Sequence, residues 1–518
     1  MIVSRAHDGK ALTDSPVWLR LWSLLPLFLI TLPLCYVAIR TSQSGLGGLA
    51  QELLRERTAV LLLNTVTLAV GVTLVTSVIG VAVAWCVERT HLPGRRVWRI
   101  AAGLPLAVPA FVSSYAWASI DGAFQGMPGA ILILSLSSYP LVYMPVAAAL
   151  QSVDPAFEDI SRSLGYGPTR TFRHALLPQL IPALGAGALL VLTHMFAEFG
   201  ALALLRVQTF TTAIFESYEL QFDNTSAAAQ SMVLMVLCIP AAYAEMRIRG
   251  RRSVARIGRG AVRKPALVHL GKMTWLTFMG FVLLSVLALG VPVTTLVYWL
   301  LQGHSFGQGY GEVVSATLGS LSLAASGALA TSILALPLVL LSIRYRSRLS
   351  LIADRLPYIV HALPGVVVAL ALVFLSIRVL PVLYQTHFVL LCAYAILFLP
   401  LAQSSLRASV ELVPQQLEHI ARSLGRNPFQ VFISVVLPNI TPGIGAAFAL
   451  MMLEIFRELT ATLMLAPTGT RTLATEVWSY TFDAEYAAAA PYAASLVVLS
   501  ILPVWVFTQR MLQQGSAR

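Results

Sequence analysis

The chain has 518 residues, of which 57% are hydrophobic and 11% charged, and its mean hydropathy is +0.77. This composition lies far outside the range of soluble domains and indicates a membrane protein. The net charge of +12 does not indicate a nucleic-acid partner, because the basic residues gather in short loops between apolar runs. Four widely spaced cysteines, in or beside apolar segments, exclude a disulfide framework and a cysteine metal site.

Twelve apolar runs follow one another along the chain, each near the length that a bilayer span requires. The first extends to about residue 39 and lacks a small-residue cleavage site, so we expect an uncleaved span. The others fall near residues 59–87, 101–120, 129–150, 183–205, 227–246, 274–300, 313–343, 356–380, 387–406, 441–465 and 487–508. The sequence therefore predicts an all-α membrane protein with twelve transmembrane helices in two six-helix halves.

Loop charges predict the orientation of these spans. Basic clusters follow the second and eighth spans and fill the connection between the halves, whereas the opposite loops are acidic. The basic residues are Arg89, Arg95, Arg96, Arg99, Arg247, Arg249, Arg251, Arg252, Arg256, Arg259, Arg263, Lys264, Lys272, Arg344, Arg346, Arg348 and Arg355. The acidic residues are Glu216, Glu219, Asp223, Glu476, Asp483 and Glu485. We expect both termini and the basic loops to lie in the cytoplasm.

One segment occurs twice, at residues 158–178 (EDISRSLGYGPTRTFRHALLP) and 418–438 (EHIARSLGRNPFQVFISVVLP), 260 residues apart. The same offset pairs Pro182 with Pro442 and Glu198 with Glu458. Such agreement indicates an internal duplication. It predicts a first transmembrane half at 1–246, a basic linker at 247–272 and a second transmembrane half at 273–518. The linker either joins two ancestral halves or contacts anionic lipid or a partner protein.

Each copy is predicted to form a small helical hairpin. Asp154-Pro155 and Asn427-Pro428 are start signals, and Gly165 and Gly425 suit the end of a helix. Apolar residues recur at helical spacing, at Phe157, Ile160 and Leu164 and again at Leu417, Ile420 and Leu424. This stripe either packs on the protein itself or contacts a partner.

These segments resemble the EAA loop of ABC importer permeases, with a Gly followed at fixed spacing by Leu-Pro, although most alanines of that motif are missing. In that family the loop is a cytoplasmic coupling helix that docks on an ATPase subunit. The resemblance implies ATPase-coupling roles for Glu158, Arg162, Gly165, Pro178, Glu418, Arg422, Gly425 and Pro438. It also implies two separately encoded ATPase subunits, an extracytoplasmic substrate-binding protein, surrounding membrane lipid and a location in the bacterial inner membrane.

No phosphate-binding loop, metalloprotease helix or nucleophile elbow occurs in the sequence. We therefore expect a transport subunit without catalytic residues, bound metal or cofactor, whose energy comes from a separate subunit or an ion gradient. An ion-coupled secondary transporter also uses internal repeats. The paired cytoplasmic docking segments favour the ABC importer.

Four ionisable residues are predicted within spans, where such groups indicate function. They are His194 and Glu198 on the fifth span and Glu454 and Glu458 on the eleventh. Residues four apart share a helix face, so the two helices could line one translocation path. The alternative is that these groups pair with Arg206, Arg457 or the backbone and fix helix packing.

The substrate expectation depends on resemblance. The segments at 199–215 and 458–478 are similar to stretches in the ferric iron branch of the family, whose two-domain permeases have about this length. Thiamine, phosphonate and polyamine permeases have similar loops. Carboxylates at Glu198, Glu454 and Glu458 would suit a hard cation, but also a polyamine or thiamine. Ferric iron is the predicted substrate, and the other three are alternatives.

Overall fold

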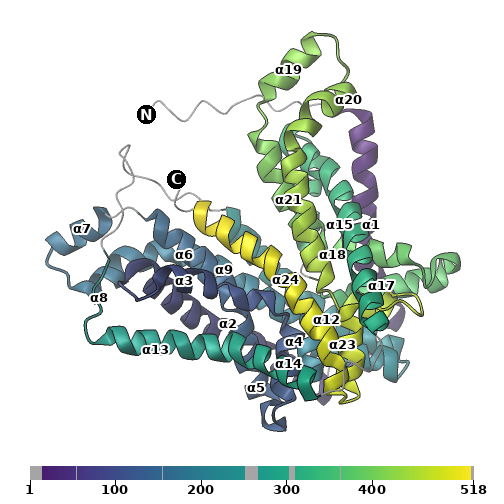
Figure 1. Ribbon diagram of the computed structural model, residues 1–518. Coiled ribbons are helices and arrows are strands. Elements are labelled where there is room, and N and C mark those ends of the chain that lie inside the picture. Colours follow the sequence, from purple (N-terminus) through teal and green to yellow (C-terminus); the bar gives the residue numbers. More distant parts are fainter. Residues whose placement is uncertain are drawn as a thin grey trace. The chain divides into compact units, whose positions relative to one another are not determined.

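Helices make up nearly all of the chain (Figure 1). This computed structural model describes residues 15–53, 55–153, 156–250, 267–302, 310–361 and 363–514. Within these ranges, the only β pairing is an isolated parallel bridge between Thr90 and Val268. The all-α class predicted from composition is therefore confirmed.

The helices follow the predicted apolar runs closely. Before the linker they are α1 (Val17–Leu53), α2 (Glu56–Arg89), α3 (Arg95–Ala101), η1 (Leu104–Ala107), α4 (Ala110–Ala118), η2 (Gly122–Phe124), α5 (Met127–Ser138), α6 (Pro140–Ser152), α7 (Ala156–Ser163), α8 (Pro168–Thr171), η3 (Phe172–Leu176), α9 (Leu177–Ala197), α10 (Gly200–Leu204), α11 (Phe210–Phe215), η4 (Glu216–Leu220) and α12 (Asn224–Gly250). After it they are α13 (Met273–Ser285), η5 (Val286–Gly290), α14 (Val291–Gln302), α15 (Tyr310–Arg344), α16 (Arg348–His361), α17 (Gly365–Arg378), η6 (Pro381–Leu383), α18 (His387–Leu412), α19 (Gln415–Ser423), α20 (Pro428–Val431), η7 (Phe432–Val436), α21 (Leu437–Phe456), α22 (Thr460–Leu465), α23 (Leu473–Phe482) and α24 (Tyr486–Gln514).

The described residues do not confirm all twelve predicted spans. The described residues contain nine helices long and apolar enough to cross a membrane, or up to eleven if each of two bent pairs counts as one span. The bent pairs replace the third and ninth predicted runs, with bends of 85° and 107°. Pro109 and Pro364 stand immediately before the second helix of each pair. Proline cannot donate the backbone hydrogen bond that a continuous helix needs, which explains both breaks.

The fifth and eleventh spans also end earlier than the apolar runs at 183–205 and 441–465 suggested. α9 ends at Ala197 and α21 at Phe456, and each is followed by a short separate helix, α10 or α22. Apolar composition continues through the break, so hydropathy alone did not reveal it.

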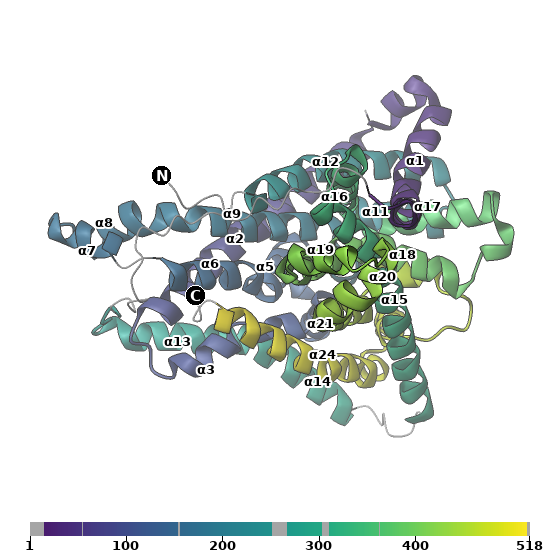
Figure 2. The same cartoon turned by 90° about the horizontal axis from the view of Figure 1, so that it is seen from above.

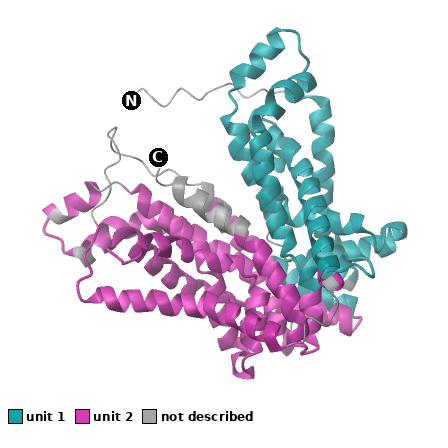
Figure 3. Ribbon diagram, in the orientation of Figure 1, with its two compact units in different colours: residues 1–50, 223–235, 314–475 teal, residues 51–222, 236–313, 476–518 magenta. Residues whose placement is uncertain are grey.

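The chain forms two compact units (Figure 3). Unit 1 comprises residues 1–50, 223–235 and 314–475, and unit 2 comprises residues 51–222, 236–313 and 476–518. Each unit thus combines segments from both sequence repeats. These units, which are defined by contacts, differ from the halves at 1–246 and 273–518, which are defined by the duplication. Residues 251–266, most of the basic linker, lie outside the described ranges.

Small residues allow the helices of unit 2 to pack closely. α2, α6 and α9 pack against one another. A Cβ on Gly80 would lie 2.8 Å from the Val142 side chain, and one on Gly187 would lie 2.9 Å from the Val142 backbone. Close approach of this kind stabilises helix contacts in a membrane, where the hydrophobic effect between helices is absent.

Candidate functional site

The repeated segments form two helical hairpins, each at one end of its unit. In unit 2, α7 and α8 lie beyond the ends of α6 and α9 (Figure 1, Figure 2). In unit 1, α19 and α20 lie beyond the end of α21 (Figure 1). The Asn427 side chain accepts a hydrogen bond from the Gln430 N–H and Gln430 bonds back, which confirms the predicted helix start. Asp154 and Pro155 lie outside the described residues.

Gly165 and Gly425 have backbone φ angles of +77° and +83°, in the left-handed region. A Cβ at either position would meet nothing within 4 Å. Glycine is therefore favoured by backbone conformation rather than by lack of space, as expected for a residue just past a helix end.

Glu158 is buried and holds α7 against the rest of unit 2. Its Oε1 accepts a hydrogen bond of 2.7 Å from Arg89 Nη1, and the two side chains are 7% and 1% exposed. Arg89 Nη2 also donates to the Leu150 carbonyl at 2.9 Å, near the end of α6. One guanidinium thus joins the ends of α2 and α6 to the first helix of the hairpin. We call this set the Arg89 clamp.

Unit 1 contains the same arrangement. Arg344 Nε lies 2.8 Å from Glu418 Oε1, with side chains 7% and 10% exposed. Arg344 Nη2 donates to the carbonyls of Val410 and Val413 at 3.1 and 2.9 Å, at the end of α18. We call this set the Arg344 clamp. Arg422, on the same helix as Glu418, adds an Nη2–Oε2 approach of 3.8 Å.

The surroundings of the Arg344 clamp also perturb a tyrosine. Burial raises the pKa of Tyr345, and the neighbouring guanidinium of Arg422 partly offsets this shift. Tyr345 therefore stays a neutral hydroxyl at physiological pH. The charges at this clamp are those of the arginines and Glu418.

Arg89 and Arg344 were identified from the sequence only as orienting charges, not as site residues. Each is the last residue of its span, α2 or α15, but the two are 255 residues apart rather than 260. The shared position at the span end was the available signal. The side chain of predicted Arg162 lies outside the described residues.

The apolar stripe of each hairpin faces outward rather than into the protein. Ile160 and Leu164 on the first hairpin are 58% and 66% exposed. Leu417, Ile420 and Leu424 on the second are 41%, 56% and 76% exposed. Glu158 and Glu418 occupy the opposite, buried faces of their helices. Phe157, the first member of the first stripe, is half-buried. The other members do not pack within their units, so they are available to a partner.

Both hairpins join their span through one π-helical turn, η3 or η7. The Leu177 N–H bonds to the Phe172 carbonyl, and the Leu437 N–H bonds to the Phe432 carbonyl. Each turn is followed at once by the Leu-Pro of the repeat. Pro178 and Pro438, the second residues of α9 and α21, have no N–H to donate and so mark the change from π to α geometry.

Glu198 and Glu458 lie at the breaks after α9 and α21, and their carboxylates bond to the short helices that follow. Glu198 Oε1 accepts from the Ala201 N–H at 3.0 Å. Glu458 accepts from the N–H groups of Ala461 and Thr462 at 2.9 and 3.1 Å, and from the Thr462 hydroxyl at 3.1 Å. Both glutamates therefore satisfy backbone donors that the break leaves without a helical partner.

The other two predicted path residues are less constrained. His194 on α9 is half-exposed, and its Nε2 lies 3.8 Å from Glu198 Oε2. Glu454 lies on α21, one turn before the break at Arg457. His194 and Glu198 belong to unit 2 and Glu454 and Glu458 to unit 1, so each pair is placed within its own unit.

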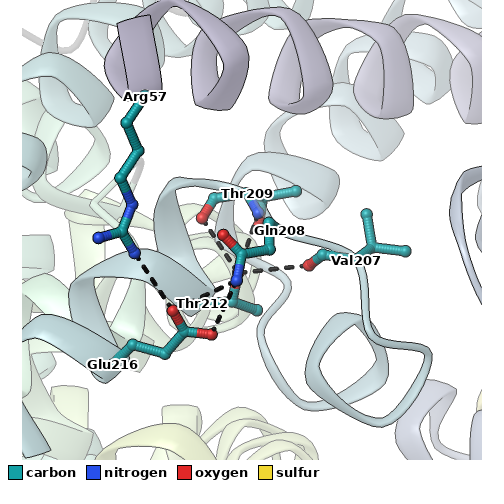
Figure 4. A network of polar contacts seen from close by, with 6 residues as sticks. All are labelled: Arg57, Val207, Gln208, Thr209, Thr212 and Glu216. Carbon is teal, nitrogen blue, oxygen red and sulfur yellow. Dashed lines mark hydrogen bonds and ion pairs between the residues drawn. The ribbon is translucent and has the colours of Figure 1, made fainter. Parts of the chain in front are cut away.

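A polar network fixes the loop that follows α10 (Figure 4). Arg57 Nη2 lies 3.3 Å from Glu216 Oε2, and the Gln208 amide donates to both oxygens of that carboxylate. The Thr209 N–H donates to the Thr212 hydroxyl at 2.9 Å, which caps α11. This network could not be predicted from the sequence, because its members are spread over α2, the loop before α11, α11 itself and η4.

The second copy caps α23 in the same way, through Thr472 and Thr475. Thr472 is 263 residues after Thr209, so the 260-residue register is interrupted here. The offset that pairs Glu198 with Glu458 therefore does not apply to the caps of this loop, which follows the span.

Among the described residues, no group of three or more His, Cys, Asp or Glu side chains could hold a metal ion. The features that recur in both repeats are instead the two clamps and the two hairpins.

Comparison with known proteins assigns this architecture. The family described as "Binding-protein-dependent transport system inner membrane component" matches residues 17–245 and 327–509, one copy in each half. The chain is 45% identical over 494 residues to the Fe(3+)-transport system permease protein FbpB 2 of Haemophilus influenzae, covering 94% of this chain and 97% of that protein. It is 29% identical over 178 residues to the sulfate transport system permease protein CysT of Salmonella typhimurium, covering 30% of this chain and 64% of that protein. The chain therefore belongs to the binding-protein-dependent transport system inner membrane component family, as an ABC importer permease that carries two copies of the family's domain.

Proposed function

We propose that the chain is the membrane permease of an ATP-driven importer of ferric iron. The observation that carries this proposal is the 45% identity that extends over nearly all of both chains to a permease named for Fe(3+) transport. Similarity to the permease named for sulfate transport covers only about a third of this chain. An extracytoplasmic binding protein would deliver the iron, which is substrate and not a resident metal.

The two hairpins are the proposed docking sites for two separate ATPase subunits. The support for this proposal is the pair of exposed apolar stripes. Apolar patches on a water-exposed surface mark interaction sites. ATP binding would draw the two ATPase subunits together and move the hairpins with them. Each clamp would transmit that movement to the ends of two helices. The equilibrium between two conformations of the spans would then shift toward one of them.

Glu198, Glu458, His194 and Glu454 remain proposed residues of the translocation path. The capping bonds of Glu198 and Glu458 support a role in holding the breaks after α9 and α21. His194 and Glu454 are the members of the set whose side chains are not used in a cap.

Iron uptake tests the substrate assignment. A strain that lacks this chain and any redundant iron importer should lose uptake of radiolabelled ferric iron under iron limitation, and should retain thiamine uptake. Restoring the chain should restore iron uptake. Unchanged iron uptake together with lost thiamine uptake would assign the chain to the thiamine branch instead.

We also propose twelve spans with both termini in the cytoplasm, counting each bent pair and α24 as one span each. On a background without Cys35, Cys86, Cys238 and Cys392, a cysteine at position 256 should resist labelling from outside intact cells. A cysteine at position 219, or at the 82% exposed Phe222, should be labelled. The prediction follows from the distribution of arginine and lysine. The reverse labelling pattern would place the hairpins outside the cell, where no ATPase could reach them.

A further inference from the structure

A groove of about 660 Å³ lies in unit 2 beside the Arg89 clamp. It runs between α2 and the segment formed by η3 and α9. Its lining is mostly apolar but includes Ser77, Thr171 and Glu158, whose carboxylate is paired with Arg89. Its main lining residues are Val78, Val81, Trp85, Phe172, Leu176 and Leu184. Its volume is within the range of ligand sites, roughly 300–1,000 Å³. Leu74 and Val78 on α2 are 62% and 71% exposed, so this helix side belongs to the apolar outer surface of the unit.

The equivalent surface of unit 1 is covered by the protein itself. Phe432 is the repeat counterpart of Phe172, and Trp18 and Trp22 of α1 pack on it with ring centroids 5.5 and 6.2 Å away. Trp18 also contacts Phe429 at 5.5 Å. In unit 2, Phe172 instead contacts Trp85 of the groove wall at 4.8 Å.

The helix that begins the second half does not take the place of α1 in unit 2. α13 packs through Phe278 and Phe281 on Trp98, with ring centroids 5.8 and 5.5 Å apart. Within the part of the chain that the structure describes, the two copies thus present the same apolar surface differently. An aromatic helix covers it in one copy, and a groove bordered by Val268 remains in the other.

The two copies also differ in charge next to this surface. The first has three exposed basic residues, Arg170, Arg173 and His174, which adjoin the groove residues Thr171 and Phe172 along the chain. Their counterparts in the second copy are the uncharged Gln430, Ile433 and Ser434. The cations at these three positions therefore accompany the groove of the first copy and are replaced by uncharged residues in the second.

We propose that the groove binds an anionic phospholipid of the surrounding bilayer, with an acyl chain between α2 and α9 and the phosphate at the three basic residues. Apolar walls match a hydrocarbon chain, and basic residues at the end of a span match an anionic headgroup. A soluble anion would leave the apolar walls without a contact, and a neutral lipid would leave the cations without a counter-charge. The lipid would stabilise the first hairpin through Phe172, in the place where α1 stabilises the second.

Photo-cross-linking in vesicles tests this proposal. The full chain is reconstituted in phosphatidylcholine vesicles that contain a trace of phosphatidylglycerol with a diazirine in its acyl chain, or of phosphatidylcholine with the same label. The phosphatidylglycerol probe should label peptides containing Trp85 or Phe172 on the order of tenfold more than the phosphatidylcholine probe. Excess unlabelled phosphatidylglycerol should compete, and inorganic phosphate should not.

Two variants separate the charge from the groove. R170Q/R173I/H174S, which gives the first hairpin the residues of the second, should lose on the order of tenfold in labelling. Ala82→Trp, which fills the groove and leaves the cations in place, should lose labelling as well. The matched control Q430R/I433R/S434H adds the same charges where α1 covers the surface, and should gain none.

Several results would overturn the proposal. Equal labelling by the two probes would do so, as would unchanged labelling of R170Q/R173I/H174S. Labelled peptides away from the groove, or a protein covalently captured at the groove in native membranes, would also do so. Size-exclusion profiles of the variants check folding, and the triple variant keeps the test decisive if Ala82→Trp misfolds. Because lipid labelling needs neither ATP nor iron, its outcome is independent of the proposed transport function.

Discussion

Replacing Glu158 and Glu418 together by glutamine is expected to abolish iron uptake while the protein still inserts into the membrane. Each change leaves a buried guanidinium, Arg89 or Arg344, without its carboxylate. Breaking a buried pair by removing one partner costs about 3–5 kcal/mol, because the remaining charge stays away from water. The loss would weaken the attachment of each hairpin to the ends of two spans. A hairpin moved by an ATPase would then no longer move the spans.

The measurements are uptake of radiolabelled ferric iron and thermal unfolding of the purified protein. Glu411→Gln is the matched control, because it removes an exposed carboxylate near the second hairpin. In a double-mutant cycle, E158Q and R89Q should each be severe, and the double variant should cost less than their sum. Full uptake by E158Q/E418Q would show that the clamps do not transmit movement.

Much of the fold could be predicted because a bilayer makes apolar length a strong signal. The runs at 59–87 and 313–343 correspond closely to α2 and α15. The breaks could not be predicted, since the residues around Glu198 and Glu458 are mostly apolar or small and continue the hydropathy of the span. A carboxylate that bonds to backbone N–H groups three and four residues later stabilises a helix start there.

The hairpins were predictable from local chemistry, whereas the clamps were not. Gly165 and Gly425 are identified by their place after an amphipathic helix, within a few residues of sequence. Arg89 is 69 residues from Glu158, and its charge already had an explanation as an orienting residue after a span. Apart from the span-end position that Arg89 shares with Arg344, nothing in hydropathy or spacing distinguishes an arginine that also carries a buried ion pair.

The membership of the two units was equally hidden from the sequence. The duplication suggests two self-contained halves, yet residues 1–50 belong with residues 314–475. Aromatic contacts such as that between Tyr36 and Phe374, with centroids 5.0 Å apart, join these distant segments within unit 1. The periodicity of a sequence does not indicate which apolar helices pack together. Helix surfaces that face lipid and those that face another helix are similarly hydrophobic.

Replacing Gly165 and Gly425 together by valine is expected to abolish uptake as well, through the backbone rather than through charge. Both residues have positive φ, which a β-branched side chain strongly disfavours, at a cost of roughly 1–3 kcal/mol for each position. The hairpin would relieve this strain by changing the angle between its two helices, so that the exposed stripe no longer fits the ATPase. We expect lost iron uptake and weaker co-purification of the ATPase, with normal insertion into the membrane.

The chain contains a matched control for this change. Gly167 lies two residues further on, also has no atom within 4 Å of a Cβ, and is not among the glycines with positive φ. Gly167→Val adds the same bulk to the same loop and should leave uptake near the wild-type level. Gly165→Asn with Gly425→Asn should restore much of the activity, because asparagine tolerates the left-handed conformation better than valine does. Equal loss in the Gly167 variant would mean that bulk in the loop, and not backbone conformation, decides the coupling, and wild-type uptake by the double valine variant would remove the hairpins from the transport mechanism.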